Sequence, residues 1–241
     1  MFMKGYKMRI LDIVKDLVFP QGLYCNCCGK YTDDKRRYGL CDHCIEHMNF
    51  ETIRIQFPKD CNVSSGMAAM KYGLYEKKLI FSLKYNGKTY MAPVLARIMY
   101  DAMLSELASK KSCKLLKTDL IVPVPISRER LKKRGFNQME KVGRHLSGLT
   151  GIPMDVNLLK RVRETTAQRA LSPIERKNNM IDAFSVNPDR LKKLQGKSIL
   201  LIDDIYTTGA TAAECCKVMA KAGAKEICFL AVMAASRQER V

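Results

Sequence analysis

The stretch that most constrains the fold is Ser198-Ile-Leu-Leu-Ile-Asp-Asp-Ile-Tyr-Thr-Thr-Gly-Ala-Thr211. It begins with apolar residues and no polar alternation, a pattern typical of a parallel strand that is buried on both faces. A turn rich in Thr and Gly follows, and a helical pattern comes next. The stretch therefore predicts a strand, a loop and a helix, with backbone N–H groups and hydroxyls gathered at a helix N-terminus.

Two adjacent carboxylates, Asp203 and Asp204, come directly before this loop. The helix N-terminus favours a phosphate, and the carboxylates can accept hydrogen bonds from hydroxyls. A ribose 5-phosphate presents both kinds of group. The alternative is that Asp204 only caps a helix of an ordinary α/β domain, but a cap requires neither a second acid nor a Thr/Gly loop.

Four of the ten cysteines stand in two C-x2-C pairs separated by twelve residues, and these are Cys25, Cys28, Cys41 and Cys44. Each pair can hold one edge of a tetrahedral Zn(II), so the pattern predicts a small structural zinc ribbon with no open position for catalysis. Free or redox-active thiols are the alternative. Cys27 or His43 could also replace one ligand, although this would break the two-residue spacing. The remaining cysteines are expected to be small core residues.

Positive charge is concentrated in the middle of the chain. The formal net charge is +18, and residues 110–177 carry 17 Lys and Arg against 6 Asp and Glu. This distribution favours a polyanion such as single-stranded DNA, and the competing interpretation is a solvated basic surface with a few phosphate-binding cations. Lys132, Lys133 and Arg134 are the candidate nucleic-acid contacts.

No apolar run is long enough for a membrane span, and Met1 to Pro20 has the pattern of an amphipathic helix and lacks the features of a signal peptide. We therefore expect a cytoplasmic protein.

The order of several motifs resembles a known family. The stretch from Asp203 to Thr211 is similar to the phosphoribosyl pyrophosphate (PRPP) signature of type I phosphoribosyltransferases. A Val-Pro-Val-Pro run ending at Pro125, then Arg134-Gly-Phe-Asn-Gln138, Thr166-Ala-Gln168 and Arg176-Lys-Asn-Asn179 precede it, all behind the four cysteines. Together these motifs resemble the ComF family of competence proteins from about Cys25 to Val232.

The resemblance implies roles for individual residues. Asp203 and Asp204 would hold the ribose hydroxyls of PRPP, and they are also the candidates for catalysis. Mg(II) would bridge oxygens of the ribose and the pyrophosphate. Ser127 and Arg128 would contact the pyrophosphate. The loop that binds PRPP and its 5′-phosphate would consist of Ile205, Tyr206, Thr207, Thr208, Gly209, Ala210 and Thr211. A flexible loop reaching the pyrophosphate would contribute Arg163, Gln168, Arg169 and Arg176.

The expected fold is α/β, a type I phosphoribosyltransferase-like doubly wound parallel sheet with a small N-terminal zinc ribbon. Residues 1–60 would form the amphipathic helix and the ribbon, and residues 61–241 the phosphoribosyltransferase-like domain. By resemblance, the function would be PRPP binding in DNA uptake and natural transformation, with single-stranded DNA and a DNA-uptake helicase or channel component as partners. An active phosphoribosyltransferase of nucleotide metabolism and a PRPP-sensing regulator without catalysis are the alternatives, and ribosyl transfer itself stays open.

Overall fold

The computed structural model describes residues 23–33, 36–85, 89–109, 113–163 and 180–235. The chain divides into two compact units, Met1–His47 and Met48–Val241. The division comes earlier than the expected boundary at residue 60, because strand β1 (Ile53–Arg54) pairs with the sheet of the second unit. The amphipathic helix expected over Met1 to Pro20 lies outside the described residues.

The N-terminal unit is built from short elements around its cysteines. An isolated β-bridge joins Tyr24 to Tyr31, and the 3-10 turn η1 (Arg37–Gly39) and the helix α2 (Asp42–Glu46) follow. Gly29 and Gly39, beside the two C-x2-C pairs, have φ values of +74° and +61°. Both glycines therefore occupy the left-handed backbone region that residues other than glycine rarely adopt.

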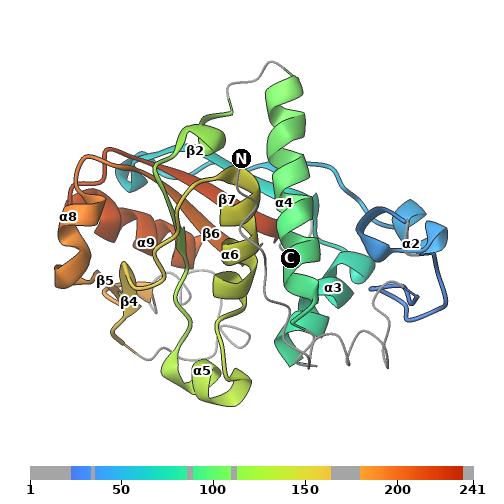
Figure 1. Ribbon diagram of the computed structural model, residues 1–241. Coiled ribbons are helices and arrows are strands. Elements are labelled where there is room, and N and C mark those ends of the chain that lie inside the picture. The colour runs from blue at the N-terminus through green and yellow to red at the C-terminus, as the bar shows by residue number, and fades with distance from the viewer. Residues whose placement is uncertain (1–22, 34–35, 86–88, 110–112, 164–179, 236–241) are drawn as a thin grey trace, which may run out of the picture. The chain divides into compact units, whose positions relative to one another are not determined.

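The second unit is organised on a five-stranded sheet in the order β1-β2-β7-β6-β3 (Figure 1). Its parallel strands are β2 (Val63–Lys71), β7 (Glu226–Ala234), β6 (Ser198–Tyr206) and β3 (Leu120–Pro123), and β1 is antiparallel to β2. The first part of β6 is completely buried, as its apolar run predicts.

Helices cover both faces of this sheet. Helix α9 (Ala210–Lys221) packs on a face that includes Ile199, Leu201 and Phe229. The side chains that alternate with these along the strands point to the opposite face of the sheet. On that side α4 (Met91–Ala108) contacts β2 and β7, α6 (Gln138–Thr150) contacts β3 and β6, and α3 (Leu74–Tyr85) packs on α4. This arrangement confirms the predicted doubly wound sheet.

Smaller elements connect the sheet and its helices. They are η2 (Lys59–Cys61), η3 (Lys114–Lys117), α5 (Arg128–Arg134), η5 (Pro188–Arg190) and α8 (Leu191–Leu194). Strands β4 (Leu159–Arg161) and β5 (Phe184–Val186) pair in a separate two-stranded antiparallel sheet. The polar segment between β4 and β5 lies largely outside the described residues.

Three details of these elements shape the carboxyl edge of the sheet. The segment from Arg128 to Thr150 is divided into α5 and α6, because Gly135 ends α5 with a φ of +77° and the side chain of Asn137 caps α6. Strand β6 continues through Asp203 and Asp204 to Tyr206, because these residues still pair with β7. Strand β3 includes Pro123, which lies opposite Ile202.

Five of the six cysteines outside the C-x2-C pairs are buried, as expected for core residues, and these are Cys61, Cys113, Cys215, Cys216 and Cys228. Cys27 is half-buried. Within the described residues, no helix is long and apolar enough to cross a membrane.

Candidate functional site

A polar cavity of about 90 Å³ opens where β3 and β6 reach their carboxyl ends. In a parallel α/β sheet this is the edge at which ligands bind. The polar and charged residues that line the cavity are Arg130, Arg134, Asn137, Gln138, Arg161, Asp203, Asp204 and Thr211. The cavity therefore combines two carboxylates with three guanidinium groups.

A second cavity of about 30 Å³ lies at the loop before α9 and shares Asp203, Ile205 and Thr211 with the first. Its other lining residues are Tyr206, Thr207, Thr208, Gly209, Ala210 and Ala212. The structure therefore brings every residue of the expected PRPP loop to the same cavity as Asp203, directly before the N-terminus of α9.

Gly209 is required by the geometry of this loop. Its φ is +78°, and a Cβ at this position would lie 2.4 Å from Oη of Tyr206. The Tyr206 ring is held by edge-to-face packing on Phe57, with ring centroids 5.7 Å apart, and by packing on Phe229 at the same centroid distance. The loop is therefore held close over an aromatic support with no space for a larger residue.

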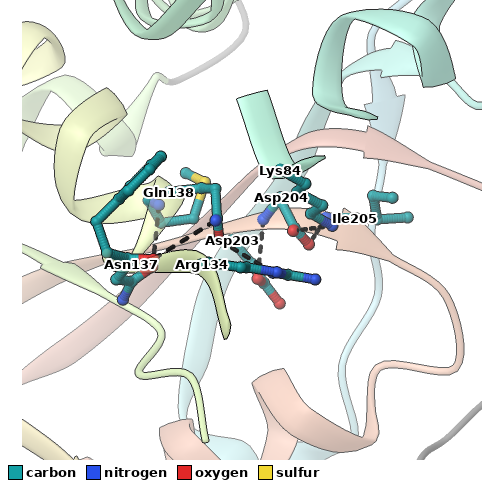
Figure 2. Close-up of polar contacts among 9 residues, drawn as sticks. Lys84, Arg134, Asn137, Gln138, Asp203, Asp204 and Ile205 are labelled. Atoms are coloured by element: carbon teal, nitrogen blue, oxygen red, sulfur yellow. Dashed lines mark hydrogen bonds and ion pairs between the residues drawn. The ribbon is translucent and has the colours of Figure 1, made fainter. Parts of the chain in front are cut away.

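The two acids lie within β6 and differ in their surroundings (Figure 2). The ammonium of Lys84 forms an ion pair with Oδ2 of Asp204, and only 12% and 24% of the two side chains are exposed. Asp203 accepts a hydrogen bond of 2.8 Å from the backbone N–H of Asp204. Burial, with the nearby charge of Asp204, raises the pKa of Asp203 to about 7. Near neutral pH, Asp203 therefore exchanges between an acceptor and a donor form.

The opposite wall of the cavity comes from the turn between α5 and α6 (Figure 2). Nδ2 of Asn137 donates to the carbonyl of Val124 at 3.0 Å, while its Oδ1 accepts from the N–H of Met139. Buried Gln138 accepts a hydrogen bond of 3.0 Å from Arg134. These bonds fix the N-terminus of α6 beside the end of β3.

The predicted pyrophosphate contacts occupy different places. Ser127 is buried, and its hydroxyl caps α5 by accepting from the N–H of Arg130 at 3.3 Å. Arg128 is exposed and is absent from the cavity lining, whereas Arg130 belongs to the lining. Ser127 and Arg128 therefore lie at the start of α5, and Arg130 and Arg134 of the same helix line the cavity.

The other predicted residues are divided in the same way. Lys132 and Lys133 are exposed on α5, and Arg134 turns into the cavity. Arg163 donates to the carbonyl of Ile181 at 2.6 Å, while Arg161 lines the cavity. Gln168, Arg169 and Arg176 lie outside the described residues.

Five polar or charged residues of this site are not among the contacts assigned from the sequence, and these are Lys84, Arg130, Asn137, Gln138 and Arg161. The signal available in the sequence was the accumulation of cations beside Gly, Asn and Gln between residues 130 and 138. Which of these cations faces the sheet depends on the break at Gly135, and this break follows from a positive φ that residue type alone does not fix.

The arrangement as a whole suits an anionic sugar. Guanidinium groups and the N-termini of α6 and α9 can neutralise phosphate oxygens. The carboxylates of Asp203 and Asp204 can pair with hydroxyls. The cavity thus offers both kinds of partner that a phosphorylated ribose needs.

The N-terminal unit contains a second candidate site. The Sγ atoms of Cys25, Cys28, Cys41 and Cys44 all lie within 4.8 Å of one another, and those of Cys28 and Cys41 are 3.7 Å apart. A tetrahedron of Zn–S bonds of about 2.3 Å places its sulfurs about 3.8 Å apart. The four thiols therefore fit a structural zinc ion, and they are the four predicted from the two-residue spacings. His43 instead lies against His47, with ring centroids 4.2 Å apart.

The thiols of this cluster are not equivalent. Burial disfavours the thiolate of Cys25, but backbone N–H groups of Cys28, Cys41 and Cys27 outweigh it and lower the pKa of Cys25 to about 6. Burial, followed by hydrogen bonds with the neighbouring thiols, raises the pKa of Cys44. The surroundings of the cluster thus stabilise the thiolate of Cys25 but do not compensate the negative charge of four thiolates. A bound Zn(II) would supply the missing positive charge.

The chain is similar in sequence to a known domain family and to several known proteins. Residues 131–241 match the phosphoribosyl transferase domain family. The chain is 34% identical over 149 residues to "Competence protein F" of Haemophilus influenzae and 32% identical over 149 residues to "DNA utilization protein YhgH" of Salmonella typhimurium. Each match covers 62% of this chain and 63% of the relative.

"Competence protein ComFC" of Bacillus subtilis is 35% identical over 102 residues, which cover 40% of this chain and 37% of that protein. The chain therefore spans less than two thirds of the length of these relatives. Its C-terminal part carries a phosphoribosyl transferase domain, and these competence and DNA utilization proteins are homologues of the chain.

Proposed function

We propose that the chain binds PRPP together with Mg(II) at the carboxyl end of its sheet, and that it acts on incoming single-stranded DNA. The observation that supports PRPP most strongly is the pair of adjoining cavities, in which the loop from Thr207 to Thr211 and the acids Asp203 and Asp204 meet. The names of the relatives, which refer to competence and DNA utilization, support the cellular role.

In this proposal the two ends of PRPP are held by different groups. The 5′-phosphate would accept hydrogen bonds from backbone N–H groups of the Thr207–Thr211 loop at the N-terminus of α9. The ribose hydroxyls would pair with Asp203 and Asp204. The pyrophosphate would lie against Arg130, Arg134 and Arg161, whose planar forks suit phosphate oxygens. Mg(II) would neutralise the charge that these cations leave.

Lys84 has a place in the same scheme. Its ammonium compensates the charge of Asp204 inside the protein, so the acid pair is stable before any ligand arrives. A ribose hydroxyl that donates to Asp204 would share this carboxylate with Lys84. Binding would therefore require little rearrangement of β6.

The DNA contact would involve the outer side of α5. Lys132 and Lys133 are exposed there, on the same helix whose Arg134 lines the cavity. A single strand would be held mainly through its phosphates, with an affinity that falls steeply with salt. This role also places the chain in the cytoplasm, with a zinc ion that stabilises the N-terminal unit.

Isothermal titration of PRPP with Mg(II) into the zinc-loaded protein tests the ligand. Two lost hydrogen bonds to charged groups predict a roughly 100-fold weaker affinity for the double variant Asp203→Asn/Asp204→Asn. Asp119→Asn is the matched control, because Asp119 also accepts a β6 backbone N–H, from Ser198 at 2.8 Å, but at the amino end of the strand. Equal binding by the wild type and the double variant would exclude the acids from the site.

The same preparation separates binding from catalysis. Release of pyrophosphate when nucleobases are added would support an active transferase. PRPP binding without turnover, together with a change in the affinity for single-stranded DNA, would support a ligand-controlled DNA-binding protein. Absence of oligonucleotide binding at low salt would contradict the DNA role and leave the PRPP site unaffected.

A further inference from the structure

A second basic cavity, of about 500 Å³, lies on the outer side of β3. We call it the α6–α8 groove, and its charged lining residues are Arg144, Asp155, Arg190 and Lys193. It shares no lining residue with the cavity that contains Asp203 and Asp204. The groove therefore needs its own explanation.

The floor of the groove is fixed to the sheet. The N–H of Asp155 donates to the carbonyl of Ile121 at 3.0 Å, and Met154 bridges to the same residue of β3. Oδ1 of Asp155 accepts from the N–H of Asn157 at 2.9 Å. Asp155 is thus held in one position by the backbone on both sides.

Asp155 is a buried acid that attracts two cationic side chains but accepts no hydrogen bond from either of them. Its side chain is 8% exposed, and Oδ2 lies 3.6 Å from Nη1 of Arg190 and 3.7 Å from Nζ of Lys193. These distances allow charge attraction but are too long for hydrogen bonds, and Oδ2 has no hydrogen-bond partner within the described chain. The N–H donors of Arg190 and Lys193 therefore remain available for another acceptor.

The charges at the groove favour an anion. Arg144 is paired with Glu140 at 2.7 Å, so the three cations face two carboxylates and one positive charge is left over. Lys193 and Arg144 are 58% and 62% exposed, which makes their charges accessible from solvent. A phosphodiester carries one negative charge and only oxygen acceptors, so it matches both the excess charge and the unused donors.

The position of the groove relates it to the proposed DNA role. Asp155 bonds to Ile121, whereas the PRPP cavity begins at Val124, three residues further along β3. At about 3.3 Å per residue, the two regions are roughly 10 Å apart along the sheet edge. A strand lying on this edge could therefore reach the groove and leave the PRPP cavity free.

We propose that the α6–α8 groove binds a backbone phosphodiester of single-stranded DNA through Arg190 and Lys193, with Asp155 as the buried anchor that positions both cations. This inference rests on the DNA-binding part of the proposed function. The PRPP cavity takes no part in this contact.

The test is the fluorescence anisotropy of a labelled 20-nucleotide oligo(dT), titrated with the full-length zinc-loaded protein at several salt concentrations. Lys193→Gln and Arg190→Gln should each weaken binding about 3- to 10-fold and reduce the salt slope by about 0.7, the value for one phosphate contact on a single strand. Affinity for PRPP with Mg(II), measured by titration calorimetry, should stay within twofold of the wild type.

Lys197→Gln is the matched control. Lys197 is also an exposed lysine that faces an aspartate, with its Nζ 3.6 Å from Oδ1 of Asp119, but it lies outside the groove lining. It removes the same charge and should change the affinity less than the groove variants do. Equal losses in Lys193→Gln and Lys197→Gln would show a general electrostatic effect and would overturn the groove.

The remaining outcomes distinguish the two proposals. Wild-type protein that does not bind oligo(dT) at low salt contradicts the DNA role itself. Wild-type binding with unchanged affinity and salt slope in both groove variants overturns the groove alone. If thymidine monophosphate binds the wild type but not Lys193→Gln, while oligo(dT) binds both equally, the site takes a free nucleotide and the phosphodiester assignment is wrong.

Discussion

The four-cysteine cluster and the Asp203/Asp204 pair both bring together side chains that become negatively charged when they lose a proton. They differ in how this charge is compensated. In the cluster, four sulfurs lie within 4.8 Å of one another. In the acid pair, Lys84 lies against Asp204, and the raised pKa of Asp203 lets that carboxyl keep its proton up to about neutral pH.

The difference separates a closed site from an open one. Four thiolates complete a tetrahedron, so the cluster has no position for a substrate, and a bound zinc ion would contribute to folding. The acid pair is compensated by the protein itself and faces a cavity. The first group is therefore suited to stability and the second to ligand binding.

The largest expected effect is on the closed site. Removing zinc with a chelator, or the variant Cys44→Ser, should unfold the N-terminal unit, because structural zinc contributes on the order of 10 kcal/mol to such units. Hydrogen exchange measured by mass spectrometry should lose protection over residues 23–47 and keep it in β6 and β7. Cys27→Ser is the control, because Cys27 is outside the cluster. Full protection of the unit after chelation would mean that it folds without metal.

The next largest effect concerns the charge that makes the open site stable. Lys84→Met leaves the carboxylate of Asp204 largely buried without its ammonium, which should cost about 2 kcal/mol of unfolding free energy at pH 7. Urea unfolding measures this loss. Lys217→Met is the control, since Lys217 pairs with Asp60 at 2.5 Å but 60% of that aspartate is exposed. Similar losses in both variants would show that burial of the Asp204 pair has no special role.

The parts of this molecule that the sequence predicts are those in which a local residue pattern is compatible with a single structure. Buried strands appear as apolar runs, and the cysteine spacing identifies four ligands that the fold brings together. The Thr/Gly loop follows its strand and precedes a helix as predicted, and Gly209 lies where a Cβ would meet the ring of Tyr206.

The unpredicted part depends on which way a side chain turns. Among the cations of α5, Arg130 and Arg134 line the cavity, whereas Arg128 does not. This choice follows from the helix break at Gly135 and from the cap formed by Ser127. Lys84 reaches Asp204 across 120 residues of sequence, and no local pattern contains such a contact. The groove around Asp155 is unpredictable for the same reason.

A smaller effect is expected at the loop. Gly209→Ala would place a Cβ 2.4 Å from Oη of Tyr206 at a φ of +78°, so the loop must shift. We expect a loss of about 1–2 kcal/mol in stability and a roughly tenfold weaker affinity for PRPP. Gly151→Ala is the matched control, with a φ of +74° and open space at its Cβ. It should share the backbone strain and leave PRPP affinity unchanged, and a parallel loss of affinity would mean that the close approach at Tyr206 is unimportant.

The smallest effect tests the raised pKa of Asp203. The pKa of this carboxyl is about 7 in the folded protein, against an ordinary value of 3.8 for aspartate. The carboxyl therefore binds its proton more tightly in the folded state, and its ionisation destabilises the protein as the pH rises from about 4 to 7. Asp203→Asn cannot ionise, so it should be more stable than the wild type at pH 8 and about equally stable at pH 4.

Thermal unfolding at both pH values measures this difference, and Asp119→Asn should give the opposite sign. The backbone N–H of Ser198, followed by the nearby Lys197, lowers the pKa of Asp119. Its charge therefore stabilises the folded state above its unfolded pKa, and this contribution is lost as the pH falls through its folded pKa. Asp119→Asn should accordingly lower the melting temperature at pH 8. Equal shifts in the two variants would mean that the two ends of β6 do not differ electrostatically. The electrostatics of the carboxyl end would then no longer support a ligand site there.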